Sequence, residues 1–382
     1  MTKDLFPSPP PLTPPHPEEE WLSWLRLLRS RRVGPATFFR LMQDHGTADE
    51  ALRALPEVAR AAGVKDYQVC PEAVALAELK AGKLAGAQLL ATGTPDFPEL
   101  LRNISDAPPF LWCLGNRAVL QRPMLAIVGA RNASSVGTRM ARKLAADLSD
   151  AGYVIVSGLA RGIDTASHVA AAPKGTLAVM AGGVDVVYPA ENAVLAQEIL
   201  QSGLRISEHP MGLRPQARHF PQRNRLISGL CQGVIVVEAA LRSGSLITAR
   251  SALDQGREVW AVPGHPFDGR ASGGNILIRD GATLVRSAQD VLDMLADQTK
   301  QIGQAKPVTA PAPPPAKTKK PLREIADLHS DILSRLSACP VAEDQLIRDL
   351  ALPVGTVAPA LINLELDGKI NRQPGGMLNL AV

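Results

Sequence analysis

The sequence predicts a multidomain protein built around a doubly wound α/β domain with a mostly parallel sheet. The first observation is a series of short apolar runs without polar alternation, each followed by a helical stretch, which is typical of strands buried on both faces. The second is a helical spacing of apolar residues before this region. The third is a proline-rich segment after it, followed by a pattern of three short helices and a hairpin. These patterns predict a small N-terminal helical domain and a C-terminal winged-helix domain on either side of the α/β domain.

The 382 residues are expected to form five segments. Residues 1–17 are a proline-rich tail that cannot pack a core and is expected to be disordered. The helical domain follows over residues 18–88, with helices expected after Glu18, around Phe38 and from Ala48. The α/β domain covers residues 89–297, an extended Pro/Ala/Lys-rich linker covers 298–322, and the winged-helix domain covers 323–382. Six apolar runs predict strands of the sheet: Leu125–Gly129, Val154–Gly158, Leu177–Met180, Leu204–Ser207, Val234–Glu238 and Val259–Val262.

Composition narrows the class of protein. A hydrophobic fraction of 46% supports a sizeable core and excludes a disordered chain, and the net charge of +4 is only mildly basic. No apolar run approaches the length of a membrane span and the tail has no apolar signal core, so we expect a cytoplasmic protein. The four cysteines form no CxxC pair, so they predict small core residues and neither a metal site nor a disulfide framework; no cofactor is expected either. They are Cys70, Cys113, Cys231 and Cys339.

Ligands of parallel α/β sheets collect at the carboxyl ends of the strands, so the segments after the strands are the candidate site. The first runs from Gly129 to Gly137, where small residues and a helix N-terminus suit an anion and Arg131 adds a charged group. Because the segment lacks GxGxxG, it does not predict a dinucleotide site. A tight strand-to-helix turn without a ligand explains the same residues.

The second segment runs from Ser157 to His168. Asp164 and His168 are four residues apart, a spacing that could serve acid–base or metal chemistry. Because no third ligand lies nearby in the sequence, a structural pairing between helix and loop is the favoured interpretation.

The segment from Leu213 to Leu226 is the most informative, because it contains four arginines and one aromatic residue. Arginines suit the phosphates of single-stranded DNA, and an aromatic ring such as Phe220 can stack on a base. A solvated loop with one core phenylalanine is an equally good explanation of this segment alone. The arginines are Arg214, Arg218, Arg223 and Arg225.

A further segment follows the strand that ends near Glu238. Ser243 and Ser245 are expected to open a helix and to form another anion-binding turn. Glu238 itself could be a general base, or it could hold Ser243 or Arg161 in place.

Taken together, these segments resemble the DNA-processing protein A family, DprA, also called Smf. The resembling strings are VSGLARGIDTASH, GGVDVVYPAEN, HFPQRNRLISGL, VVEAALRSGSLITA and VPG…SGGN…LIRDGA, in this order over the α/β region. The resemblance implies a Rossmann-like core with a positively charged pocket for single-stranded DNA. The candidate DNA-binding residues are Gly129, Arg131, Ser157, Gly158, Arg161, Gly212, Arg214, Arg218, Phe220, Arg223, Asn224, Arg225, Ser243 and Ser245.

The resemblance also implies a homodimer formed through the α/β domain, binding of the RecA recombinase, and loading of RecA onto incoming DNA in natural transformation. The N-terminal region resembles the sterile-alpha-motif-like (SAM-like) domain of the family. Two residues depart from the family pattern: Val136 stands where a tyrosine is common, and Ala217 stands where some relatives have a lysine. Arg214 or Arg218 could supply the charge that is missing at position 217.

Two other functions compete with DNA binding. An enzyme of a related Rossmann-like fold, such as a nucleotide hydrolase or phosphoribohydrolase, would carry a PGGxGTxxE segment, whereas this chain has Gly182-Gly183 followed by Val-Asp and has no Walker loop; we therefore expect no enzyme. A winged-helix transcription regulator would bring basic residues to DNA. Residues 323–382 contain five basic and eight acidic residues, a net charge of −3, and the expected recognition helix over 357–367 has no Lys or Arg.

Overall fold

The computed structural model divides the chain into two compact units, Met1–Gln298 and Thr299–Val382, which are described separately. The predicted tail and most of the predicted linker lie outside the described residues. The described residues are 18–304, 322–336, 341–350, 352, 357, 360, 361, 364, 365, 369–373 and 377–380.

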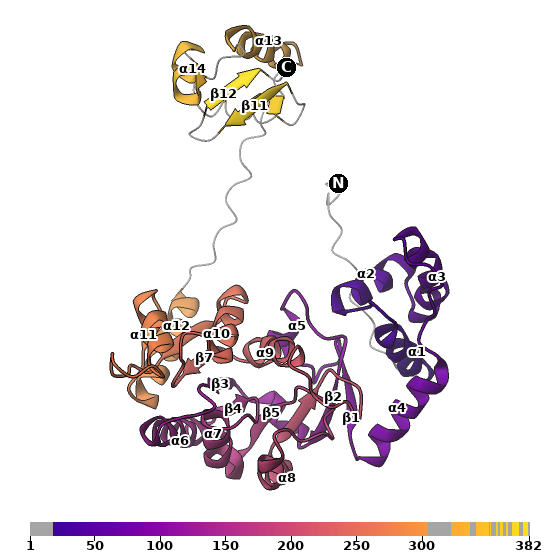
Figure 1. Cartoon of the computed structure of the whole chain (residues 1–382), viewed down its shortest axis with the longest axis vertical. Helices are drawn as coiled ribbons and strands as arrows, with labels where there is room; N and C mark the ends of the chain where they lie inside the picture. Colours follow the sequence, from indigo (N-terminus) through magenta and orange to yellow (C-terminus); the bar gives the residue numbers. More distant parts are fainter. Residues whose placement is uncertain are drawn as a thin grey trace. The chain divides into compact units, whose positions relative to one another are not determined.

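The first unit begins with four helices, drawn in indigo and violet in Figure 1. They are α1 (Glu18–Arg29), α2 (Pro35–His45), α3 (Ala48–Ala61) and α4 (Glu72–Leu84). The first three are the predicted helices, and they enclose a core in which the rings of Trp24 and Phe38 meet edge to face at 5.1 Å. The fourth helix is not predicted. Its apolar residues do not form one buried stripe, because Val74, Leu76 and Leu84 are exposed while Glu78 is buried.

The α/β domain is built on a nine-stranded sheet in the order β1-β2-β6-β5-β4-β3-β7-β8-β9. The predicted strands correspond to β3 through β8, and each of these pairs in parallel with its neighbours among them. The sequence patterns missed β1 and β2, which pair antiparallel at one edge, and β9 at the other. The strands are β1 (Gln88–Ala91), β2 (Phe110–Gly115), β3 (Met124–Val128), β4 (Val154–Ser157), β5 (Thr176–Val179), β6 (Leu204–Ser207), β7 (Gly233–Val236), β8 (Glu258–Ala261) and β9 (Thr283–Leu284).

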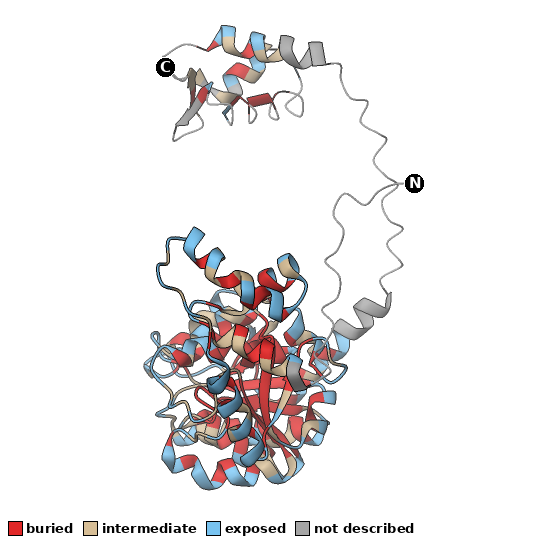
Figure 2. Ribbon diagram, turned by 90° about the vertical axis from the view of Figure 1, so that its right-hand side faces the viewer, coloured by how far each residue is buried: buried red, intermediate tan, exposed pale blue. Residues whose placement is uncertain are grey.

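Helices cover both faces of the sheet, as the doubly wound prediction requires (Figure 1). Alternate residues of the central strands serve opposite faces: Leu125 and Ile127 pack with α6 and α7, whereas Ala126 and Val128 pack with α9 and α10. Figure 2 shows the resulting buried interior. The helices of this domain are α5 (Glu99–Arg102), α6 (Ser135–Asp150), α7 (Ile163–Ala171), α8 (Ala193–Ser202), α9 (His219–Leu230), α10 (Gly244–Asp254), α11 (Ser272–Arg279) and α12 (Ala288–Gln304).

The direction in which the chain adds successive strands to the sheet reverses between β3 and β7. From β3 the chain passes through α6 to β4 on one side, and from β7 it passes through α10 to β8 on the other side. Because α6 and α10 cover opposite faces, a crevice opens between the carboxyl ends of these two strands. This is the position at which open α/β sheets bind ligands.

One boundary of the predicted linker is wrong. Helix α12 runs to Gln304, so residues 298–304 are helical and not extended. Glutamine and lysine, which are good helix formers, dominate this stretch, and the first proline comes only at Pro307.

The second unit has the winged-helix pattern. It contains α13 (Leu322–Arg335), α14 (Glu343–Leu350) and helical residues between Val357 and Glu365, followed by the predicted hairpin of β11 (Ile370–Gln373) and β12 (Met377–Leu380). A short strand that the sequence did not predict, β10 (Val341–Ala342), completes the sheet in the order β10-β12-β11. Thr356, the expected cap of the third helix, lies outside the described residues.

A buried ion pair joins the helical domain to the sheet. Nε and Nη2 of the Arg29 guanidinium donate to the carboxylate of Glu78, at 2.9 and 2.8 Å. The indole N–H of Trp112 donates to the same carboxylate at 2.8 Å. Gly82 makes room for the ring, because a Cβ at this position would lie 2.3 Å from the Trp112 side chain. Helices α1 and α4 are therefore fixed to strand β2 by one carboxylate.

We expect Glu78→Gln to lower the free energy of unfolding by about 3–5 kcal/mol, because it leaves a buried guanidinium without its countercharge. Chemical denaturation followed by tryptophan fluorescence measures the change, since Trp112 lies at the junction.

The matched control is Glu72→Gln. Glu72 also pairs with an arginine of α1, but at 3.6 Å and with a side chain that is 58% exposed. We expect this substitution to cost at most about 1 kcal/mol. Equal effects of the two substitutions would show that the buried pair does not hold the junction.

Candidate nucleic-acid interface

A cleft with a volume of about 590 Å³ occupies the crevice between β3 and β7. Its walls are the segment after β3, the first turns of α9, and the segment after β7 with the start of α10. We call it the switch-point cleft. Four arginines line it, and Asp164 is the acidic residue among its lining residues, so its charge favours an anionic ligand. The arginines are Arg131, Arg223, Arg242 and Arg270.

Arg131 and Phe220 meet at one side of the switch-point cleft. The guanidinium carbon of Arg131 lies 5.1 Å from the centroid of the Phe220 ring, which is a cation–π distance. The ring of Tyr188 also lies near Phe220, with 5.7 Å between centroids. Both aromatic residues also line a side pocket of about 330 Å³ that shares Arg131 with the cleft. The structure thus brings together Arg131 and Phe220, two candidate contacts from segments that are far apart in the sequence.

Arg223 lies at the floor of the cleft and is buried. Its Nη1 donates to the carbonyl of Val179 at 2.5 Å, its charge is near that of Asp164, and its Nε has no hydrogen-bond partner. Burial lowers its pKa to about 10, against the opposing effect of Asp164, so it stays charged at neutral pH. Position 158 must be glycine for this arrangement, because a Cβ there would lie 2.0 Å from the Arg223 guanidinium.

The N-terminus of α10 lines the cleft, as predicted, whereas the N-terminus of α6 is not among the lining residues and already binds the Glu238 carboxylate. Ser134 caps α6 by accepting the N–H of Gly137 at 2.9 Å, and Ser243 caps α10 by accepting the N–H of Ser245 at 3.4 Å. Asn224 ties α9 to α10 by donating to the carbonyl of Gly244 at 3.2 Å. Gly129, Ser243 and Ser245 line the cleft with them. Backbone N–H groups at helix starts are ready-made donors for phosphate.

The sequence left open whether Glu238 holds Ser243 or Arg161, and in the structure its carboxylate binds Ser134 instead. Its carboxylate accepts the hydroxyl of Ser134 at 2.5 Å and the backbone N–H of the same residue at 2.9 Å. Glu238 therefore joins the end of β7 to the start of α6. The sequence could not reveal this contact, because the two residues are 104 positions apart.

Several predicted DNA contacts lie elsewhere. Arg225 is the clearest departure: its guanidinium pairs with Glu208 and, at 3.1 Å, with Asp106. Arg161 lines the side pocket, where it is paired with Glu191. The hydroxyl of Ser157 is buried and donates to the carbonyl of Ile127. Gly212, Arg214 and Arg218 lie on the loop between β6 and α9 and line neither the cleft nor the side pocket.

The lining residues of this region that were not predicted as contacts include Asn132, Tyr188, Arg242 and Arg270. The first three lie in segments that follow β3, β5 and β7, so the rule that ligands collect after strands could have found them. Arg270 lies nine residues after the end of β8, and nothing in the sequence marks it.

Asp164 and His168 do not pair with each other. Asp164 accepts the N–H groups of Gly158 and Ala160, at 3.1 and 3.3 Å, and so holds the loop before its own helix. Nδ1 of His168 lies 2.9 Å from the hydroxyl of Thr176 in the interior. The structural interpretation of Asp164 is thus supported, whereas His168 belongs to a separate contact.

Within the described residues, no three or more His, Cys, Asp or Glu side chains gather in a way that could hold a metal ion. Cys70, Cys113 and Cys231 are buried thiols, in keeping with their predicted place in the core, and Cys339 lies outside the described residues. No described helix has both the length and the apolar character needed to cross a membrane.

Comparison with known families identifies the chain. The family model for DNA recombination-mediator protein A matches residues 88–296, which is more than half of the chain. The chain belongs to the DprA/Smf family. Models for the DprA-like N-terminal HHH domain and the DprA winged-helix domain match residues 18–81 and 309–376. The helical N-terminal domain is therefore matched as an HHH domain, and the predicted winged-helix domain is confirmed.

Individual members of the DprA/Smf family resemble the chain over most of its length. Protein Smf of Synechocystis is 32% identical over 93% of this chain and 96% of its own. The crystal structure of DprA from Streptococcus pneumoniae covers 71% of this chain and 97% of its own, with a TM-score of 0.61 and 37% identity. A structure of DNA processing protein A from Helicobacter pylori, which describes its single-stranded DNA binding mode, covers 56% and 96% with a TM-score of 0.52 and 31% identity.

The buried histidine below the cleft makes stability depend on pH. Burial lowers the pKa of His168 to about 3, and the charge of Arg223 acts in the same direction. The unfolded chain therefore binds a proton below its ordinary pKa of 6.5, while the folded chain does not, so stability falls as the pH drops from about 6.5 toward 3. We expect His168→Gln to remove from this slope a contribution that approaches about 1.4 kcal/mol per pH unit well below pH 6.5, measured by urea denaturation at a series of pH values from 7 downward.

Asp164 acts in the opposite direction because burial raises its pKa, but it is present in both proteins and leaves their difference in slope to His168. His265→Gln, at an exposed histidine, is the control and should leave the slope unchanged. If the free energy of unfolding depended on pH in the same way in wild type and in His168→Gln, the buried ring would take up its proton without unfolding.

Proposed function

We propose that the protein binds single-stranded DNA in the switch-point cleft and is not an enzyme. The observation that carries the proposal is the convergence of four arginines with the Phe220 ring at the N-terminus of α10. Arginine side chains and helix N-termini suit phosphates, and an exposed aromatic face suits a base.

The arrangement favours a single strand over a duplex. A base can lie against Phe220 only if it is free of its partner strand, and the cleft is a recess between loops rather than a helix or ribbon that could enter a groove. Because every base has a π face, such a site should show little sequence preference. The single-stranded DNA binding described for the Helicobacter pylori relative supports this proposal.

The family relationship extends the proposal to partners. We infer that the protein forms a homodimer through the α/β domain, and that it loads RecA onto incoming DNA in natural transformation. Membership of the DNA recombination-mediator family supports these inferences. Light scattering of the purified protein tests the dimer, and co-purification with RecA tests the partner.

The winged-helix domain is proposed not to be the main DNA reader. Arg335 donates to the carbonyl of Asp349 at 2.5 Å, and Arg348 donates to the side chain of Gln345 at 3.4 Å. Of the described residues in the third helix, Glu365 is acidic and the others are apolar. These features support a contribution other than contacting a phosphate backbone.

The charge of the cleft leads to a prediction about affinity. We expect Arg131→Glu to weaken single-stranded DNA binding strongly, since it replaces attraction with repulsion, and Phe220→Ala to cost on the order of 1–3 kcal/mol of binding free energy. Binding of wild type should weaken as salt rises, because phosphate contacts release counterions. Fluorescence anisotropy with labelled oligo(dT) and with a duplex of equal length measures each affinity.

Arg279→Glu is the control for charge, because it makes the same change at a side chain that is 73% exposed and lies outside the cleft. It should leave affinity nearly unchanged. If Arg131→Glu folds and binds like wild type, the cleft is not the DNA site.

The competing hypothesis is hydrolysis of a nucleotide with Glu238 as the base. The hydrogen bonds from Ser134 to both carboxylate oxygens make Glu238 a structural tie and leave it poorly placed to accept a proton from water. We expect no release of phosphate from ATP and no base release from nucleoside monophosphates, measured by chromatography. Turnover that disappears in Glu238→Gln would favour the enzyme instead.

A further inference from the structure

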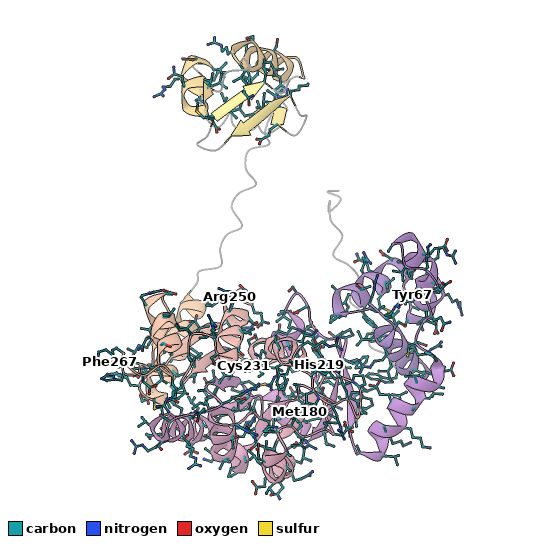
Figure 3. The ribbon with its side chains drawn as sticks, in the orientation of Figure 1. Tyr67, Met180, His219, Cys231, Arg250 and Phe267 are labelled. Atoms are coloured by element: carbon teal, nitrogen blue, oxygen red, sulfur yellow. The ribbon has the colours of Figure 1, made fainter. Side chains whose placement is uncertain are left out.

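The loop between β8 and α11 presents an unusual side chain. Phe267 is 95% exposed, the highest value among the large apolar side chains of the described residues. By contrast, Phe38, Phe97 and Phe110 are buried, and the remaining described phenylalanines are partly buried. Figure 3 shows Phe267 projecting at the edge of the α/β domain. A ring this exposed offers most of its surface to a stacking ligand.

The loop holds this ring in a defined place. The backbone N–H of Phe267 donates to Nδ1 of His265 at 3.3 Å, and the two rings lie 5.6 Å apart. Gly264 and Asn275 exchange two hydrogen bonds, of 3.2 and 3.0 Å, that close the base of the loop. The N–H of Asp268 bonds the carbonyl of His265 at 2.9 Å. Because these bonds order the loop, little conformational entropy would be lost when a ligand contacts Phe267.

Arg270 connects the loop to the switch-point cleft. It lies three residues after Phe267 and lines the cleft. Its Nε and Nη2 donate to the Asp268 carboxylate at 3.0 and 3.1 Å, and these bonds raise the pKa of Arg270, with a smaller contribution from the charge of Glu238. Arg270 therefore links the loop that carries Phe267 to the arginines that line the cleft.

The sheet order places Tyr188 and Phe267 after strands that lie on opposite sides of the cleft. Tyr188 follows β5, and Phe220 packs against it. Phe267 follows β8, which neighbours β7 on the side away from β3. A path along the carboxyl edge of the sheet thus runs from Tyr188 and Phe220 across the cleft to Arg270 and Phe267.

We propose that Phe267 is a second stacking platform for single-stranded DNA, and that Arg270 guides the strand to it from the switch-point cleft. The inference rests on the proposed function and adds to it the course of the strand. A protein partner is the less favoured occupant, because Phe267 is flanked by His265, Asp268 and Arg270 and is not part of an apolar run. A single ring among charged and polar residues suits a base next to a phosphate.

The test compares wild type with Phe267→Ala on oligo(dT) strands of increasing length. A strand too short to leave the cleft should bind both proteins equally, whereas longer strands should bind Phe267→Ala on the order of tenfold more weakly. Phe267→Trp should restore the affinity. Long strands that carry abasic sites outside the cleft-bound segment should abolish the difference, because the ring then has no base to contact.

Leu84→Ala is the matched control, because it removes an apolar side chain that is 80% exposed on α4, and it should change no affinity. Equal affinities of wild type and Phe267→Ala at every length would overturn the inference while leaving the cleft site intact. A changed oligomer mass with unchanged DNA affinity would also overturn it, in favour of a protein contact. If wild type bound no strand of any length, the proposed function and this inference would both fail.

Discussion

The candidate site depends on one buried cation, the guanidinium of Arg223, which packs directly against Gly158. Arg223 reaches the floor of the cleft because Gly158 has no side chain. The charge of Asp164 offsets that of the guanidinium, and the Val179 carbonyl accepts one of its hydrogen bonds. Since the same Asp164 carboxylate also binds the loop N–H groups, the ends of β4, α7 and α9 are fixed to one another. Phe220 lies one turn before Arg223 on α9, so this pair also orients the aromatic platform. A buried charge that lost its partner would cost several kcal/mol, which keeps the arrangement in place.

A second fixed point is the carboxylate of Glu238, which ties the end of β7 to the start of α6. Close packing reinforces it, because a Cβ at Gly137 would lie 2.3 Å from this carboxylate. Around these rigid points, Arg131 and Arg242 are exposed and free to adapt their long side chains. A rigid frame with adaptable cations suits a ligand whose backbone charge is constant and whose sequence varies.

Helix α9 connects these fixed points to the rest of the first unit. Residues 223 and 225 are separated by about 200° around a helix, so their side chains leave on different sides. Arg223 therefore enters the cleft, while Arg225 pairs with Glu208 and Asp106. The backbone carbonyl of Glu208 also accepts a hydrogen bond from Arg29 of α1 at 3.2 Å, and Arg29 is bound by Glu78. Ion pairs and a hydrogen bond thus link the helical domain to α9, which also carries Arg223 of the candidate site.

Local patterns in the sequence determined the three-domain organisation, the six central strands and the helix start at Ser243, because periodicity and turn chemistry act over a few residues. Helix α4 and the edge strands escaped prediction because tertiary packing, and not an apolar stripe, stabilises them. Only the tertiary structure decided which arginines converge, what Glu238 binds, and that Phe267 is exposed beside Arg270. These features depend on the order of strands in the sheet, which brings together residues far apart in the chain and which no local pattern encodes.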